Sequence, residues 1–109
     1  NQALQHRAAD LYADLEYARS MALYARLAVT AEGEGAEKDR HRDVIAAKIV
    51  IDATSRHISQ ESIQMHGATG ISQWSPLGEM YQDVRHLRFA DGPDEVHWMV
   101  VGRHELSMT

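Results

Sequence analysis

The chain of 109 residues contains no cysteine, and this absence excludes two classes of site. Without thiols there can be no disulfide framework and no thiolate ligand for a metal ion. No run approaches the roughly 20 consecutive apolar residues of a membrane span, and the first residues lack the apolar centre of a signal peptide. We therefore expect a soluble chain, cytoplasmic if its source is bacterial or in an organellar matrix if it is eukaryotic.

Positive charge is also scarce, with 11 Lys and Arg against 16 Asp and Glu, a net charge of -5. The basic residues are scattered, which argues against a nucleic-acid partner or an anionic membrane surface. Hydrophobic residues make up 44% and charged residues 25%, values ordinary for a globular protein of single-domain length. A chain this short buries a modest share of its surface, so we expect partner surfaces to cover part of it.

Only two prolines occur, and helix breakers gather at few places. Residues 2–30 carry apolar side chains at intervals of three and four, which predicts one long helix. The apolar stripe comprises Leu4, Ala8, Leu11, Leu15, Ala18, Ala22, Ala25 and Val29. The band is widened by Tyr12, Leu23, Tyr24 and Leu27. A band of this width is expected to face two neighbouring helices.

Three breaks divide the rest of the chain. The polar stretch TAEGEGAEKDR at 30–40 predicts a turn, and a helix near 37–66 follows it. The loop HGATGISQWSP at 66–76 ends with Ser75 as N-cap and Pro76 as first residue of a helix near 76–89. An Asp-Gly-Pro corner at 91–93 then precedes a last helix near 93–106. The sequence thus predicts one all-α domain over 1–109, an antiparallel, up-down bundle whose third long segment is broken.

The stretch IQMHGATGISQWSPLGEMYQDVRHLRFADGPDEVHWMVVGRHEL, residues 63–106, resembles the C-terminal segment of acyl-CoA dehydrogenases. That family has a Gln-x-x-Gly-Gly-x-Gly turn, a Tyr-x-Asp-x-Arg helix and a Glu-Gly-Thr corner. The block Asp-Gly-Pro-Asp-Glu-Val-His resembles the branch that carries Asp at the corner, and NQALQHRAADLYADLEYAR resembles the family's preceding helix. Because the family places an N-terminal helical domain and a middle β-domain upstream, the resemblance implies a fragment of a larger enzyme.

The resemblance implies a flavoprotein oxidoreductase of fatty acid metabolism. In this family a base removes the α-proton of an acyl-CoA thioester while the β-hydride passes to FAD, giving a trans-2-enoyl-CoA. Further partners implied are identical subunits in a homodimer or homotetramer, and an electron acceptor such as an electron-transfer flavoprotein. The fragment alone is expected to be inactive. From the residues themselves a second hypothesis stays open, a non-enzymatic helical module for oligomerisation.

Site residues follow from the same resemblance. Asp91 matches the catalytic base, and Gly92 would let the thioester approach the backbone. The positions matching FAD contacts are Gln2, Gln64, Met65, His66, Gly67, Ala68, Pro93, Asp94 and Glu95. In the family the turn at 64–68 serves the FAD of a neighbouring subunit.

The chain departs from the family pattern at three positions: Asp91 replaces Glu, Ala68 replaces Gly and Pro93 replaces Thr. The residues alone also allow non-catalytic roles. Asp91 can be a helix N-terminal residue, and the turn can be a helix C-cap, which needs one glycine and leaves Gly70 without a role. Gln2 can be a frayed terminal residue. Two Asp/His pairs, at 83/86 and 94/97, have the spacing of carboxylate-bridged metal bundles. Such bundles need further carboxylates from other helices, so we predict no metal site.

Overall fold

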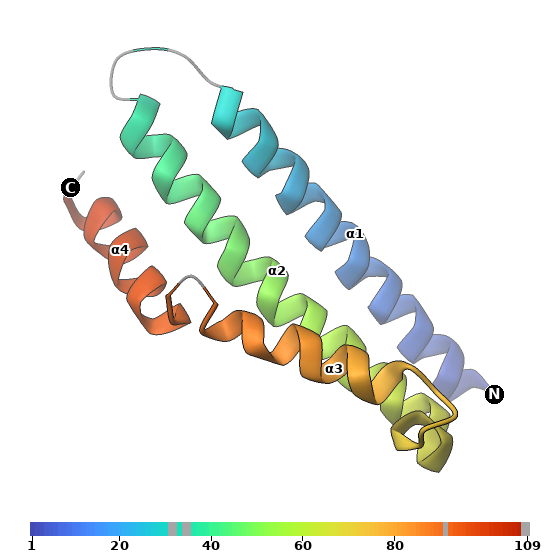
Figure 1. Ribbon diagram of the computed structural model, residues 1–109. Helices are drawn as coiled ribbons and strands as arrows, with labels where there is room; N and C mark the ends of the chain where they lie inside the picture. Colours follow the sequence, from blue (N-terminus) through green and yellow to red (C-terminus); the bar gives the residue numbers. More distant parts are fainter. Residues whose placement is uncertain (31–32, 34–35, 91, 108–109) are drawn as a thin grey trace.

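The computed structural model describes residues 1–30, 33, 36–90 and 92–107, and every regular element among them is helical (Figure 1). The α-helices are α1 (Gln2–Thr30), α2 (Ala36–His66), α3 (Leu77–Arg85) and α4 (Asp94–Ser107). Two 3₁₀ turns, η1 (Gly67–Ile71) and η2 (His86–Arg88), flank α3. The predicted all-α class is confirmed. None of these helices combines the length and the apolar content needed to cross a membrane.

Helix α2 lies in the middle of the arrangement (Figure 1). Helix α1 runs antiparallel along one side of it, while α3 and α4 follow one another along the other side. The molecule is elongated, with extents of 52 × 27 × 25 Å. The predicted up-down bundle with a broken third segment is therefore confirmed, and the break between α3 and α4 faces the middle of α2.

Two helix starts are capped by side chains. Asn1 Oδ1 accepts a hydrogen bond from the Ala3 amide at 2.9 Å at the start of α1. Ser75 Oγ accepts one from the Leu77 amide at 3.2 Å, and Pro76 already has helical angles of φ −77° and ψ −4°. The predicted helix start is confirmed, but Pro76 is the N-cap and Leu77 the first helical residue, so the predicted roles are displaced by one position. The Ser75 hydroxyl still satisfies an amide that has no partner within the helix.

The third helix is shorter than the predicted 76–89. It ends as an α-helix at Arg85 and continues as the 3₁₀ turn η2, where the amides of Phe89 and Ala90 both bond to the His86 carbonyl. The Leu87 carbonyl accepts a hydrogen bond from Lys48 Nζ on α2 at 2.9 Å. Because Lys48 already binds this carbonyl, the carbonyl does not need the hydrogen bond that a further turn of α-helix would provide. Ending the α-helix in a 3₁₀ turn therefore leaves it satisfied.

Burial is concentrated on α2, where Ile45 and Ala47 are the buried apolar residues among those described. Helix α1 has no buried residue, and Leu4 and Val29 of its predicted stripe are 44% and 58% exposed. Among the described residues α2 is the one helix packed closely along α1, so a band wide enough for two neighbours is covered on one side only. The other half of its apolar band faces solvent.

Candidate functional site

The corner between η2 and α4 is the first group of predicted site residues. Asp91, the predicted base, lies outside the described residues. Gly92 has a φ of +111°, a conformation that side chains rarely adopt. A Cβ at this position would also lie 3.1 Å from Nε2 of His97. Glycine is therefore required here by both the backbone conformation and the neighbouring imidazole, before any substrate is considered.

Asp94 begins α4 and turns its carboxylate into the protein. The residue is 3% exposed, and its Oδ2 accepts a hydrogen bond from Arg88 Nε at 3.3 Å. Lys48 Nζ lies 3.7 Å from Oδ1 of the same carboxylate. The next residue, Glu95, is exposed, and its Oε1 lies 3.6 Å from Arg88 Nη2. The predicted FAD contact of Asp94 stays a prediction. Because the side chain is bound by Arg88 and Lys48, the backbone of Asp94 would have to make that contact.

A second buried carboxylate lies behind Asp94. Asp52 on α2 is 4% exposed, and its Oδ2 lies 3.0 Å from Lys48 Nζ one helical turn earlier. Burial raises the pKa of the Asp52 carboxyl, and the Lys48 ammonium opposes that rise. Together with His97, which is 8% exposed, these groups form what we call the corner cluster: Lys48, Asp52, Arg88, Asp94 and His97.

The corner cluster balances its charges but leaves polar atoms without hydrogen bonds. Lys48 and Arg88 supply two cations for the two carboxylates. Asp94 Oδ1 and His97 Nδ1 are nevertheless buried without a hydrogen bond within the described chain, whereas Asp52 Oδ2 is paired with the Lys48 ammonium at 3.0 Å. Asp94 of the Asp94/His97 pair is thus held by Lys48 and Arg88, while His97 lies against Gly92. No group of three or more His, Asp or Glu side chains suited to a metal occurs in the ranges that the structure describes.

The turn after α2 holds the second group of predicted residues. Gly67 ends the helix with a φ of +62°, and a Cβ there would meet no atom within 4 Å. Gly70 is buried, and a Cβ there would lie 2.6 Å from the Ile63 carbonyl oxygen. The His66 Nδ1 lies 2.7 Å from the Ser62 carbonyl. Gly67 is therefore favoured by its backbone conformation, and Gly70 is required because α2 leaves no room for a Cβ. Gly70 thus has a structural role beyond the helix C-cap.

The turn also presents an exposed surface. Gln64, His66, Gly67 and Ala68 are exposed, while Met65 is half-buried. Gln2, exposed in the first turn of α1, lies at the same end of the molecule, beside the end of α2 (Figure 1). A salt bridge between the two helices near this end, Arg7 to Glu61 at 3.3 Å, fixes that arrangement.

The two groups lie far apart. Lys48, which contacts the corner, and Gln64, which begins the turn, are 16 positions apart on one helix, or about 24 Å at 1.5 Å per residue. A single chain therefore does not bring its predicted FAD positions into one compact site.

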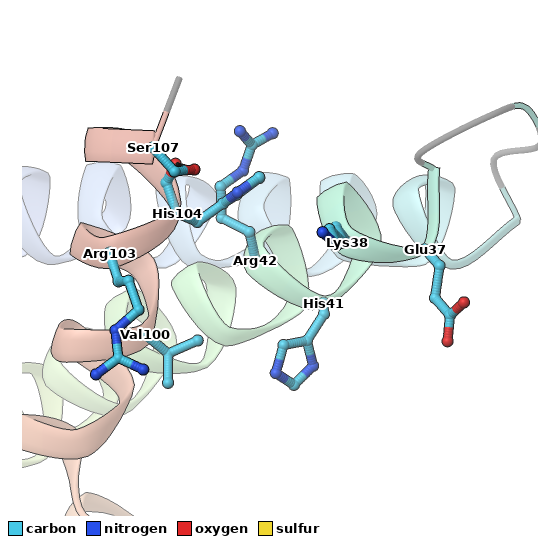
Figure 2. A pocket seen from close by; sticks show the side chains of 8 residues that line it. All are labelled: Glu37, Lys38, His41, Arg42, Val100, Arg103, His104 and Ser107. Carbon is cyan, nitrogen blue, oxygen red and sulfur yellow. Dashed lines mark hydrogen bonds between the residues drawn. The ribbon is translucent and has the colours of Figure 1, made fainter. Parts of the chain in front are cut away.

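A cleft lies elsewhere, between the first turns of α2 and the last turns of α4 (Figure 2). Its lining comprises Glu37, Lys38, His41, Arg42, Val100, Arg103, His104 and Ser107. Two of its side chains already have acidic partners, Arg42 with Glu105 at 2.9 Å and His104 with Asp39 at 3.1 Å. The cleft lies at the opposite end of α4 from the corner, and no predicted site residue lines it.

The family model for the C-terminal domain of acyl-CoA dehydrogenase matches residues 1–106. The chain belongs to the acyl-CoA dehydrogenase family. It is 37% identical over 93 residues to acyl-CoA dehydrogenase family member 10 of Mus musculus and 34% identical over 106 residues to family member 11 of Gallus gallus. It is 38% identical over 85 residues to the probable acyl-CoA dehydrogenase FadE2 of Mycobacterium tuberculosis. No solved structure gives a significant match.

These matches cover 85%, 97% and 78% of the chain but 8%, 13% and 21% of the mouse, chicken and mycobacterial proteins. The chain therefore spans a small part of the length of the curated relatives that it matches. What is shown for it is membership of the acyl-CoA dehydrogenase family and the helical fold of the C-terminal domain.

Sequence reasoning missed most of the corner cluster of this acyl-CoA dehydrogenase domain. Lys48, Asp52 and Arg88 were assigned no role, and His97 was considered only as half of a metal-like pair. One signal was available: Lys48 and Asp52 are four residues apart within the otherwise apolar stretch AAKIVIDA. Charged residues of opposite sign at that spacing on an apolar helix face indicate a buried ion pair.

Proposed function

We propose that the chain is the C-terminal helical domain of a longer, FAD-dependent acyl-CoA dehydrogenase, an oxidoreductase acting on a CH–CH group. The observation that carries the proposal is the family match over residues 1–106. On this proposal an N-terminal helical domain and a middle β-domain, outside this chain, hold most of the acyl-CoA and the flavin. The reaction converts an acyl-CoA thioester to its trans-2-enoyl-CoA, in the cytoplasm of a bacterium or an organellar matrix.

The chemistry assigned to the corner is proton abstraction. The Asp91 carboxylate takes the α-proton, the electron pair of that C–H bond becomes the new C–C π bond, and a hydride leaves the β-carbon. FAD, when bound, would supply the acceptor for this hydride, and a partner such as an electron-transfer flavoprotein would take up the electrons. Gly92, which has no side chain, lets the thioester approach the backbone next to the base. Asp is one methylene shorter than the family's Glu, so the placement of this corner is critical.

The described residues fit a flavin in two places. The exposed turn at Gln64, Met65, His66, Gly67 and Ala68 has free space around Gly67, where a cofactor can approach the backbone. The N-terminal end of α4, with Pro93, Asp94 and Glu95, carries the positive end of a helix dipole.

The separation of roughly 24 Å between turn and corner along α2 supports an arrangement in which they serve different active sites of a homo-oligomer. Gln2 lies at the turn's end of the molecule and would join the turn in that role.

The experiment uses the full-length protein with its flavin, mixed rapidly and anaerobically with acyl-CoA. Flavin absorbance should bleach in the wild type, and Asp91→Asn should slow bleaching by about 100-fold or more, given what general-base catalysis contributes. Acyl-CoA binding should survive. The matched control is Asp10→Asn, an exposed carboxylate on α1. Wild-type bleaching with an unchanged rate in Asp91→Asn would assign the base to another residue. Asp91→Glu should retain partial activity with an altered chain-length preference.

A second candidate function is a non-enzymatic oligomerisation module. The specific observation in its favour is the exposed apolar face of α1, where Tyr12, Leu23 and Leu27 are 66%, 57% and 61% exposed. The same preparation separates the two functions. A full-length protein that purifies without flavin, and that shows no bleaching with acyl-CoA after FAD is added, would favour the module.

A further inference from the structure

Lys48 contacts the chain on both sides of the corner. Its ammonium donates a hydrogen bond to the Leu87 carbonyl at 2.9 Å, before the corner, and lies 3.7 Å from Asp94 Oδ1, after it. Arg88 and Asp94 are themselves joined by the 3.3 Å bond from Nε to Oδ2. These contacts join Leu87 and Arg88, before the corner, to Asp94, after it, and Lys48 attaches both sides to the middle of α2. We call this set of contacts the clamp.

His97 supports the corner from the other direction. It lies one turn into α4, is 8% exposed, and its Nε2 is within 3.1 Å of the position that a Gly92 Cβ would occupy. The imidazole thus occupies the space directly against Gly92 on the side of α4. Position 91 adjoins Gly92, and its other neighbour, Ala90, is held by the bond from its amide to the His86 carbonyl at 3.1 Å.

The energetics of the corner cluster indicate that it fixes the position of the backbone and does not mainly add stability. Replacing a buried ion network by well-packed apolar side chains is often neutral or stabilising, so such a network is weak evidence for stability. Here the network also leaves Asp94 Oδ1 and His97 Nδ1 buried without hydrogen bonds in the described chain. Directional charged contacts do, however, fix backbone position. A displacement of about 1 Å at a reacting group can slow a reaction by roughly 100-fold.

We propose that Lys48, Asp94 and His97 are positioning residues of the dehydrogenation, holding the backbone on both sides of position 91 so that its carboxylate reaches the α-carbon. The reaction named here rests on the proposed function, whereas the clamp itself rests on the contacts above. The demand on geometry is high because this chain has Asp at position 91, where the family's commoner Glu has one more methylene to adjust its reach.

The first test measures the clamp without using activity. Hydrogen–deuterium exchange followed by mass spectrometry is applied to the full-length protein as wild type, Lys48→Met and Lys38→Met. Met keeps the length of the side chain and removes its charge, and Lys38 is an exposed residue of the same helix. We expect faster exchange in peptides covering 86–93 for Lys48→Met, with α1 peptides unchanged, and no change for Lys38→Met. Unchanged exchange over 86–93 in Lys48→Met would overturn the clamp.

The second test measures its effect on the reaction. In anaerobic rapid mixing with acyl-CoA, Lys48→Met should reduce the flavin roughly 10- to 100-fold more slowly, while the half-saturating acyl-CoA concentration stays near the wild-type value. Lys48→Arg, which keeps a cation at this position, should recover a substantial part of the rate. A lower unfolding temperature with an unchanged rate of flavin reduction would show a purely structural role and overturn the proposal.

The failure of the proposed function gives a different result. If acyl-CoA does not reduce the wild-type flavin, the proposed reaction is wrong, and the exchange experiment still decides whether the clamp exists. If the wild type is active and Lys48→Met matches it in rate, the reaction stands and the positioning role is wrong. A double variant with Asp94→Asn adds a further criterion: if both residues act through one clamp, the combined slowing will be smaller than the product of the two single effects.

Discussion

Arg88 donates a hydrogen bond from Nε to Asp94 Oδ2 at 3.3 Å, although the two residues lie on opposite sides of the break between η2 and α4. The contact is formed at the surface of α2, where Lys48 contributes a second cation. A break that looks in the sequence like a simple interruption by Gly and Pro therefore has paired charged residues on its two sides.

Arg88→Met should destabilise the chain, since Asp94 would remain buried with Lys48 at 3.7 Å as its nearest cation. A hydrogen bond to a charged group typically contributes about 1.5–3 kcal/mol, and Arg88 is 30% exposed, so we expect a loss of about 1–2 kcal/mol. Urea unfolding of the 109-residue chain measures it. Arg103→Met is the control, because within the described chain the Arg103 side chain bonds only to the exposed Met99 sulfur at 3.7 Å, and the change should alter stability by less than about 0.5 kcal/mol. Equal losses in the two variants would contradict the prediction.

Gly92→Ala should also destabilise the chain. The φ of +111° is unfavourable for any residue with a Cβ, and the new methyl would lie 3.1 Å from His97 Nε2. We expect a loss of more than about 1 kcal/mol in urea unfolding. The control is Gly102→Ala in α4, where a Cβ meets no atom within 4 Å; it should stabilise the chain by about 0.5–1 kcal/mol because Ala favours helix. Two changes of the same sign would show that the corner conformation is different from that described.

Local sequence signals predicted the helices well because each depends on nearby residues. Ser75 and Pro76 mark a helix start by their own chemistry, and Gly67 marks a helix end by its left-handed conformation. The corner cluster was not predicted because Lys48 and Asp94 are 46 positions apart, and only the packing of α4 on α2 brings them together. Periodicity identifies an apolar face, but it does not show which helix covers that face or which charged residues are buried with it.

The apolar band of α1 illustrates the same limit. Its periodicity predicted a helix with room for two neighbours, and the helix is present with one. Half-buried Leu11, Ala18 and Ala25 belong to the predicted stripe, whereas Leu15, on the same stripe, is 39% exposed. The sequence of a single chain shows that apolar area is available, and partner surfaces or further chain decide how much of it is covered.

The stability of the chain should depend on pH through Asp52, whose pKa is raised by burial above the ordinary value of 3.8. Between the ordinary and the raised pKa, folded Asp52 holds its proton more often than unfolded Asp52, so its contribution to the free energy of unfolding falls as pH rises. The cost of the buried charge is absent below the ordinary pKa and fully present above the raised one. The charged or titratable groups facing this carboxylate are Lys48, Asp94 and His97.

Asp52→Asn removes this titration while keeping the size of the side chain. Measured by urea unfolding at a series of pH values, the variant should therefore gain stability relative to the wild type as pH rises through the interval above 3.8. Asp10→Asn, on the exposed surface of α1, should follow the wild type throughout. If the stability of Asp52→Asn relative to the wild type declines with rising pH, the pairing with Lys48, and not burial, determines the direction of the pKa shift of Asp52.

The uncovered face of α1 should cause the chain to associate. Tyr12, Leu23 and Leu27 lie at helical spacing on the side turned away from α2, and each is more than half exposed. Apolar surfaces of this kind are covered by partners, and identical chains most often pair with two-fold symmetry. Sedimentation should therefore give a concentration-dependent mass above the monomer's 12.3 kDa. Leu23→Glu places a charge in this face and should shift the equilibrium toward the monomer, whereas Gln82→Glu, which adds the same charge on exposed α3, should not. A wild-type chain that sediments as a monomer at every concentration, or an equal shift in both variants, would exclude the α1 face as the interface.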